Sequence, residues 1–164
     1  MRSTISIDVD APASLVFRLA RDVERWPQLL PHYVRVRALD RDAEGRVTAE
    51  MVARRPFAPV LGLGLPVAWR SRTWSEPETL RLRFVHLGGA TNGMDVTWRI
   101  DPVGTGSRVS IDHEFWPRVP GWAAFVDRAF TRPIASRTLA TFKAIAEAVT
   151  ADESADPPPA KKQV

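Results

Sequence analysis

Two histidines, His86 and His113, are the residues of this sequence best suited to proton-transfer chemistry. Each lies in a run in which polar and apolar residues alternate, LRLRFVHL and SRVSIDHEF. Imidazole titrates near neutral pH, so a histidine that faces a ligand can accept a proton and return it. Tyr33 adds a hydroxyl group that can donate a hydrogen bond to a carbonyl oxygen. These three side chains are our candidates for general acid–base catalysis.

Other kinds of reactive site are excluded or disfavoured. The sequence has no cysteine, which rules out disulfides, thiolate catalysis and zinc held by cysteine. His86 and His113 lack a third ligand, because the nearby carboxylates fall on the opposite strand parity, so we expect no metal site. The motif GLGL at residues 62–65 lacks the strand-to-helix context of a phosphate-binding loop, and no nucleophile-elbow pattern is present.

The charge distribution argues against nucleic-acid binding. The net charge is +4, and twenty of the 23 basic residues are arginines, which are scattered through strand-like runs. A nucleic-acid-binding domain would gather them on one face. The N-terminus shows no apolar signal-peptide core, and no apolar run approaches the roughly 20 residues of a membrane span. We therefore expect a cytoplasmic protein without a nucleic-acid partner.

The elements that must position the candidate residues are mostly strands. The first strand, Ser3–Asp10, is followed by a helix over residues 10–26 and a short helical turn at residues 27–30, which Pro31 ends. Turn-rich breaks such as DRDAEG and LGGATNG separate the later strands, and such short connections favour antiparallel pairing. The later strands are Tyr33–Leu39, Arg46–Arg54, Val67–Trp74, Leu80–Leu87, Gly93–Ile100 and Ser107–Phe115.

A long C-terminal helix is the element able to cover this sheet. Its pattern runs over Trp122–Val149, with an interruption predicted at Pro133. We expect one α+β domain over residues 1–150, in which a curved seven-stranded antiparallel sheet wraps around this helix, and a disordered Pro-rich charged tail over residues 151–164. The apolar segment 56–66 is too rich in proline and glycine to be a regular element. A space is predicted between the helix and the sheet.

Strand parity predicts which side chains enter that space. The arginine-bearing faces should meet water, so the opposite faces point inward. These faces carry four polar residues among apolar ones, and burying a polar group without a partner costs ~1–3 kcal/mol. Each of the four can be satisfied by a neighbour, as most buried polar groups are, but the set as a whole favours a ligand cavity. The four residues are Ser71, Thr73, His86 and His113.

The segment IDVDAPASLVFRLARDVERWPQLLPHYVRVRAL resembles the opening of the START-like (SRPBCC) helix-grip superfamily, and the likeness continues to about residue 150. The sequence is most similar to the polyketide cyclase/dehydrase (aromatase/cyclase) group and the coenzyme Q-binding carriers. This resemblance implies a helix-grip fold, a mostly apolar cavity, and neither a metal nor a dissociable cofactor. The pocket aromatics of the cyclases match Trp26, Tyr33, Trp69 and Trp98. Their arginine position falls on Thr73, and their neutral amide position on His113.

The resemblance leaves two functions open. In a cyclase/dehydrase, His113 or His86 would take a proton, Tyr33 would donate to a carbonyl oxygen, and the tryptophans would hold a polyketide-like or aromatic substrate folded. In a carrier, the same cavity would hold a quinone or lipid without chemistry, and the 56–66 loop would be a lid or a transient membrane contact, or would simply cover the core. Trp26 can also serve only to plug one end of the core. The predicted ligand-binding residues are Trp26, Trp69, Ser71, Thr73, Phe84, Met94, Trp98 and Phe115.

Overall fold

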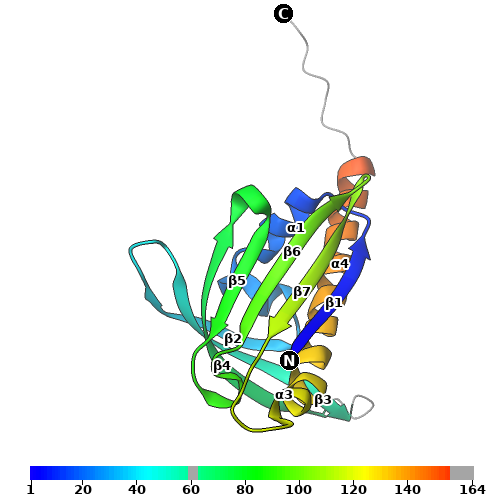
Figure 1. Cartoon of the computed structure of the whole chain (residues 1–164). Coiled ribbons are helices and arrows are strands. Elements are labelled where there is room, and N and C mark those ends of the chain that lie inside the picture. The colour runs from blue at the N-terminus through cyan, green and yellow to red at the C-terminus, as the bar shows by residue number, and fades with distance from the viewer. Residues whose placement is uncertain (59–62, 156–164) are drawn as a thin grey trace, which may run out of the picture.

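One seven-stranded antiparallel sheet organises the chain (Figure 1). The structure is a computed structural model that describes residues 1–58 and 63–155. Neighbouring strands follow the order β1-β7-β6-β5-β4-β3-β2, so the first strand pairs with the last and every other pair is a hairpin. The strands are β1 (Arg2–Val9), β2 (Tyr33–Arg41), β3 (Val47–Ala58), β4 (Leu63–Glu76), β5 (Arg81–His86), β6 (Asp95–Val103) and β7 (Gly106–Glu114).

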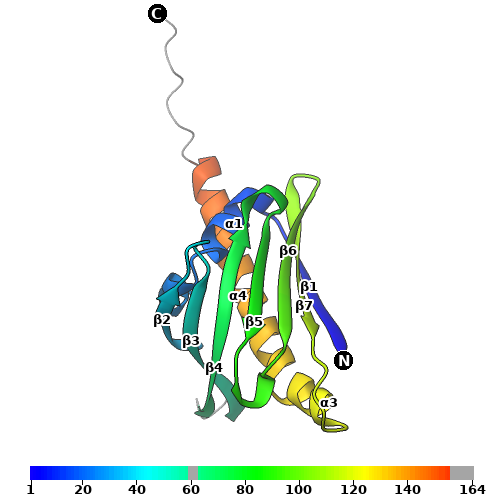
Figure 2. The same ribbon diagram turned by 60° about the vertical axis from the view of Figure 1, so that its left-hand side comes forward.

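The helices lie between β1 and β2 and after β7, as predicted. Figure 2 shows α4 running diagonally across one face of the sheet, which is the helix-grip arrangement. Short 3-10 turns complete the connections. The helical elements are α1 (Ala13–Ala20), η1 (Val23–Arg25), α2 (Trp26–Leu29), η3 (Pro77–Thr79), η4 (Gly89–Thr91), α3 (Trp122–Val126), the π-helical turn η5 (Asp127–Thr131) and α4 (Arg132–Ala155).

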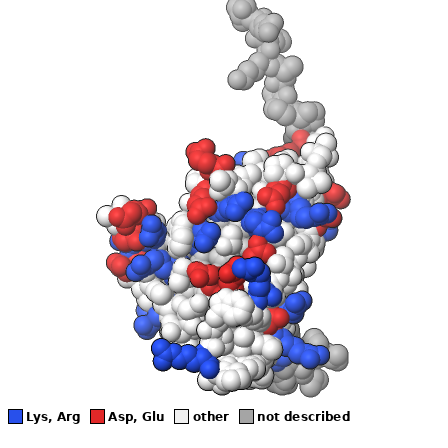
Figure 3. Space-filling model, viewed as in Figure 1, with Lys and Arg blue, Asp and Glu red and all other residues white. Residues whose placement is uncertain are grey.

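Successive side chains along each strand alternate between a buried face and a solvent-exposed face of the sheet, as predicted from the sequence. On β6, Val96, Trp98 and Ile100 are buried, whereas Asp95 is exposed and Arg99 is partly exposed. On the outer face the charged side chains are paired across strands, for example Arg99 with Asp112 at 2.7 Å. Figure 3 shows basic and acidic side chains interspersed over this outer face.

The segment 56–66 is more regular than predicted. β3 continues to Ala58 and β4 begins at Leu63, so both ends of the segment form a β-hairpin; residues 59–62 lie outside the described residues. This part of the hairpin extends past the pairing with β2, which ends at Ala53, and past the pairing with β5, which begins at Ser71. Proline is tolerated there because, within the described part of the chain, no third strand pairs with this extension and requires the N–H that proline lacks. Gly64 permits the close approach of β4 to β3, since a Cβ at this position would lie 3.2 Å from the Arg55 carbonyl oxygen.

The C-terminal helix also differs in detail from its prediction. It extends to Ala155, five residues beyond the predicted domain boundary at 150, and residues 156–164 lie outside the described part of the chain. The interruption predicted at Pro133 is present as the π-helical turn η5 immediately before α4. A proline ring would collide with the carbonyl group four residues earlier in an α-helix, and the wider π turn relieves this crowding. Within residues 1–58 and 63–155, no helix has both the length and the hydropathy needed to cross a bilayer.

Candidate functional site

A cavity of about 150 Å³ lies between the concave face of the sheet and the C-terminal helical segment. Strands β3 to β7 form one wall, and η5 with the first two turns of α4 form the other. The α2–β2 junction closes one side, and η4 closes another. Among the described residues, no Asp, Glu, Lys or Arg lines it. The lining residues used below are Trp26, Tyr33, Met51, Trp69, Phe84, His86, Thr91, Met94, Trp98, His113, Phe130, Ala135 and Thr138.

A cluster of aromatic rings explains why the cavity occupies one end of this space. Trp26 packs on Trp98 with 5.4 Å between ring centroids, and Phe142 of α4 lies 5.8 Å from Trp98 and 6.0 Å from Trp26. The indole N–H of Trp26 donates to the Ala20 carbonyl oxygen at 2.9 Å, so its polar edge is satisfied inside the protein. Trp26 is therefore both a plug for the core and part of the cavity wall.

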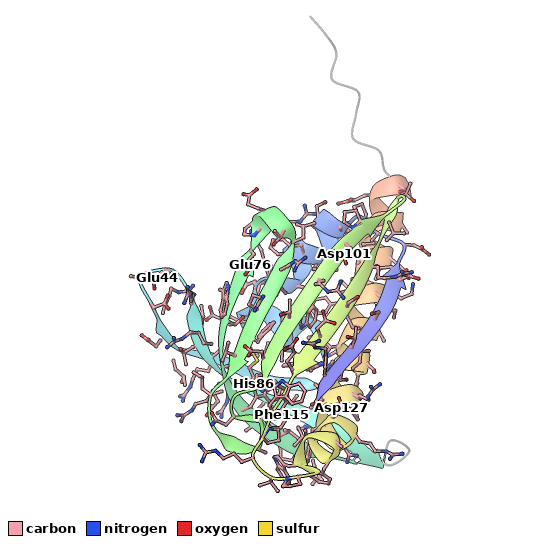
Figure 4. All side chains as sticks on the ribbon, viewed as in Figure 1. Glu44, Glu76, His86, Asp101, Phe115 and Asp127 are labelled. Atoms are coloured by element: carbon pink, nitrogen blue, oxygen red, sulfur yellow. The ribbon has the colours of Figure 1, made fainter. Side chains whose placement is uncertain are left out.

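The π turn η5 turns side chains toward the cavity. Phe130 and Thr131 line it, and Asp127 is buried with an exposed fraction of 9%. Asp127 Oδ2 accepts a hydrogen bond from Arg132 Nε at 2.8 Å. Figure 4 shows Asp127, Phe115 and His86 at the same end of the sheet. The π turn thus contains a buried carboxylate and also supplies two residues to the cavity lining.

His86 lines the cavity as a neutral imidazole. Its Nδ1 is 2.9 Å from Thr91 Oγ1, and its ring is nearly parallel to Trp69, with 6.0 Å between the ring centroids. Burial, together with a smaller effect of the neighbouring His113, lowers the pKa of His86 to about 3. At neutral pH this side chain can exchange hydrogen bonds with a ligand but carries no charge.

His113 also lines the cavity and is 5% exposed. Burial lowers its pKa to about 4, although the carboxylates of Asp127 and Asp112 act in the opposite direction. The imidazole is therefore neutral at pH 7 and has a lone pair available for a proton. The two carboxylates oppose the effect of burial on this pKa but do not outweigh it.

Tyr33 projects from the start of β2 and is the third titratable group on the cavity wall. Its ring meets Trp26 edge to face at 5.0 Å and Trp69 at 6.0 Å. Burial raises the pKa of its hydroxyl well above the usual value, with Thr138 acting in the opposite direction. Tyr33 therefore keeps its proton and can act as a hydrogen-bond donor.

His32 is a buried histidine that strand parity and the family resemblance did not single out. Its Nε2 lies 2.8 Å from Thr138 Oγ1, and Thr138 Oγ1 itself donates to the Ile134 carbonyl oxygen at 2.8 Å. The hydroxyl proton is thus committed to Ile134, so His32 carries its proton on Nε2. Burial lowers the pKa of His32 to about 4. Its role is to tie the α2–β2 junction to α4, beside Tyr33.

The structure brings most of the predicted site residues together. His86, His113 and Tyr33 line the same cavity, as do five of the predicted ligand-binding residues: Trp26, Trp69, Phe84, Met94 and Trp98. The other three, Ser71, Thr73 and Phe115, are buried but lie outside its lining. Thr91, Phe130 and Thr138 were missed because they come from a loop and from helical segments, where strand parity carries no information. No group of three potential metal ligands occurs in the described ranges.

Comparison with known proteins agrees with this architecture. The chain is 31% identical over 139 residues to the granaticin polyketide synthase bifunctional cyclase/dehydratase of Streptomyces virginiae, covering 81% of this chain and 43% of that protein. It superposes on the di-domain ARO/CYC BexL from the BE-7585A biosynthetic pathway with a TM-score of 0.71 and 29% identity, over 92% of this chain and 47% of that one. The chain thus spans less than half the length of these two relatives.

A solved structure that matches this chain over nearly its whole length supports the fold. The Zhui aromatase/cyclase from Streptomyces sp. R1128 superposes with a TM-score of 0.75 and 17% identity, covering 92% of this chain and 95% of that one. The family model described as "Polyketide cyclase / dehydrase and lipid transport" matches residues 1–147. The chain therefore belongs to the polyketide cyclase/dehydrase family of START-like proteins.

Proposed function

We propose that this domain binds an uncharged poly-β-ketone or aromatic molecule in the cavity and catalyses ring closure with loss of water. One observation carries the proposal: Tyr33, His86 and His113 line a single apolar cavity whose described lining has no charged residue. Family membership and the cyclase/dehydratase relative support the choice of reaction.

The chemistry assigns a different task to each polar group. His113 takes a proton from a carbon atom next to a carbonyl group, and the resulting enolate carbon attacks a distant carbonyl to form a carbon–carbon bond. His113 returns this proton to the new alkoxide, which becomes a hydroxyl group. His113 then takes the second proton from the same carbon atom as the hydroxide ion leaves, and the hydroxide ion accepts that proton to form water. Tyr33 donates a hydrogen bond to the enolate oxygen while charge develops there. His86 holds a second carbonyl oxygen.

The size of the cavity suggests how much of a substrate reacts at once. A cavity of about 150 Å³ in another protein accommodates one benzene ring. The cavity here has a similar volume, about 150 Å³, and the aromatic residues Trp69 and Trp98 are part of its lining. It therefore suits a chain segment that is being closed into one six-membered ring, held by aromatic contacts.

Heptane-2,4,6-trione is a suitable test compound because it contains three uncharged carbonyl groups and little else. Aldol condensation between its end methyl group and the distant carbonyl produces orcinol and one water molecule. Closure through oxygen instead produces a pyranone of the same composition. We expect the wild-type domain to raise the proportion of orcinol, which chromatography with ultraviolet detection separates from the pyranone.

Variants connect the activity to the named groups. His113→Gln and Tyr33→Phe should each lower the rate of orcinol formation, whereas Thr73→Val should not, because Thr73 is buried on the same sheet but does not line the cavity. A typical general base contributes about 10²–10⁴-fold to the rate. Orcinol formation no faster than in buffer, or equal rates for His113→Gln and wild type, would remove the catalytic proposal.

A carrier function is the second candidate, and exposed apolar side chains near the cavity favour it. Phe125 is 52% exposed, and its ring lies 5.9 Å from Phe130, which lines the cavity; Leu65 of β4 is 51% exposed. Leu65→Asp should reduce pelleting with anionic vesicles if this end touches a membrane. Val103→Asp is the matched control, since Val103 is also 51% exposed but lies at the β6–β7 turn. Equal pelleting of the two variants would argue against membrane contact.

A further inference from the structure

Three buried polar atoms near the cavity have no hydrogen-bond partner among the described residues. They are Ser3 Oγ, His113 Nδ1 and Asp127 Oδ1. The three side chains are 6%, 5% and 9% exposed, respectively. Native proteins satisfy most buried polar atoms, because a buried unpaired donor or acceptor costs about 1–3 kcal/mol. Such atoms therefore call for a common explanation if they lie together.

The fold places the three side chains together. Ser3 is directly opposite His113 in the β1–β7 ladder, so the two side chains project from the same face of the sheet. Asp127 lies in η5, next to α3, and Figures 1 and 2 both show the start of β1 beside α3. Asp127 is also the carboxylate that acts most strongly on His113, and the Ser3 backbone acts on the same ring.

The other charged groups around His113 are already engaged. Asp112 lies on the opposite face of β7, where it accepts hydrogen bonds from Arg99 at 2.7 Å and from Thr4 at 2.7 Å. Arg132 of α4 holds Asp127 Oδ2 at 2.8 Å, which leaves Oδ1 for another donor. His86 of β5 also lines the cavity, where its Nδ1 is 2.9 Å from Thr91 Oγ1, and it is neutral at pH 7.

We propose that Asp127 is a positioning residue for His113: one bound water accepts the Nδ1–H of His113, donates to Asp127 Oδ1 and exchanges a hydrogen bond with Ser3 Oγ. Three protein partners are what a buried water typically has. This arrangement holds the proton of the neutral ring on Nδ1 and leaves Nε2 as the base. When Nε2 takes a proton, the imidazolium ion lies near a carboxylate that Arg132 keeps oriented.

The tautomer of His113 tests this network, independently of turnover. Long-range ¹H–¹⁵N NMR at pH 7 should show His113 of the wild-type protein as the Nδ1–H tautomer. In Asp127→Asn the side-chain amide can donate a hydrogen bond to the water. The water can then donate to Nδ1 of His113, which shifts the imidazole toward the Nε2–H tautomer. Asp112→Asn is the matched control on the outer face and should leave the tautomer unchanged. Asp127→Asn should also lower the pKa of His113, because it removes the negative charge that raises it.

The outcomes separate this inference from the proposed function, on which its catalytic meaning rests. The Nε2–H tautomer in the wild-type protein, or an unchanged tautomer in Asp127→Asn, would overturn it. If Asp127→Asn does not fold, the wild-type tautomer and that of Ser3→Ala decide, and Ser3→Ala should show a mixture of tautomers. If the expected tautomer is found but no orcinol forms, the hydrogen-bond network around His113 is supported and the proposed cyclisation activity is refuted. With turnover present, Asp127→Asn should lower kcat and leave KM unchanged.

Discussion

Filling the cavity should stabilise the protein while it prevents ligand binding. Ala135 of α4 lines the cavity and is 7% exposed. Ala135→Leu adds three carbon atoms to this side chain, and each buried methylene contributes about 0.8 kcal/mol. If the added atoms enter empty space, the free energy of unfolding should rise by ~2 kcal/mol, reduced by a few tenths for the lower helix propensity of leucine.

Urea unfolding gives the free energy, and calorimetric titration with 1-naphthol measures binding. Ala135→Leu should weaken 1-naphthol binding about tenfold or more, a change of ~1.4 kcal/mol. Ala140→Leu is the control, because Ala140 is exposed on the same helix and reports the propensity change alone. If the site were already well packed, Ala135→Leu would instead lower the free energy of unfolding by ~1–3 kcal/mol through overpacking. A destabilised Ala135→Leu that still binds 1-naphthol like the wild type would refute the reasoning.

Two further predictions concern stability. The pKa of His86 is lowered to about 3 and that of His113 to about 4, from 6.5 in the unfolded chain. The unfolded chain therefore binds protons that the folded protein does not between pH 6.5 and 4, so stability should fall as the pH is lowered through this range, by up to ~1.4 kcal/mol per pH unit for each histidine. Urea unfolding at pH 7 and pH 5 measures this, and His86→Gln should reduce the difference; equal stability at both values would contradict it. Gly106→Ala should lower the free energy of unfolding by ~1–3 kcal/mol, because its Cβ would lie 2.5 Å from the Val9 carbonyl oxygen. Thermal unfolding measures this change. An unchanged Tm would contradict the prediction and would show that β1 and β7 can move apart at this end.

The sequence is sufficient to predict the strands and the direction of their side chains. Polar or charged residues alternate with apolar ones along β5 and β7, and because successive side chains of a strand point to opposite faces, this pattern predicts which face is buried. The alternation alone therefore assigns His86 and His113 to the inner face, where both are found. The segment 56–66 differs from its prediction because proline and glycine usually end strands, while Pro56, Gly64 and Pro66 pair within the β3–β4 hairpin, beyond the described pairing with β2 and β5.

The boundary between packed core and cavity cannot be predicted in the same way. Ser71 and Thr73 have the same parity as Trp69, yet they lie outside the cavity lining. Which inward residues face a cavity depends on where rings from distant elements meet, as Trp26 and Phe142 do at 6.0 Å. Likewise, the pairing of His32 with Thr138 joins residues 106 positions apart, and no local pattern predicts it.

The methionine methyl groups provide the most direct test of the cavity as a binding site. Met51 and Met94 both line it, whereas Met1, the third methionine of the chain, does not. Carbon-13 labelling of the methyl groups gives three NMR signals, which Met51→Leu and Met94→Leu assign. Titration with 1-naphthol should shift the Met51 and Met94 signals through the ring current of the bound ligand and leave the Met1 signal in place. Unshifted Met51 and Met94 signals at saturating 1-naphthol would contradict the account.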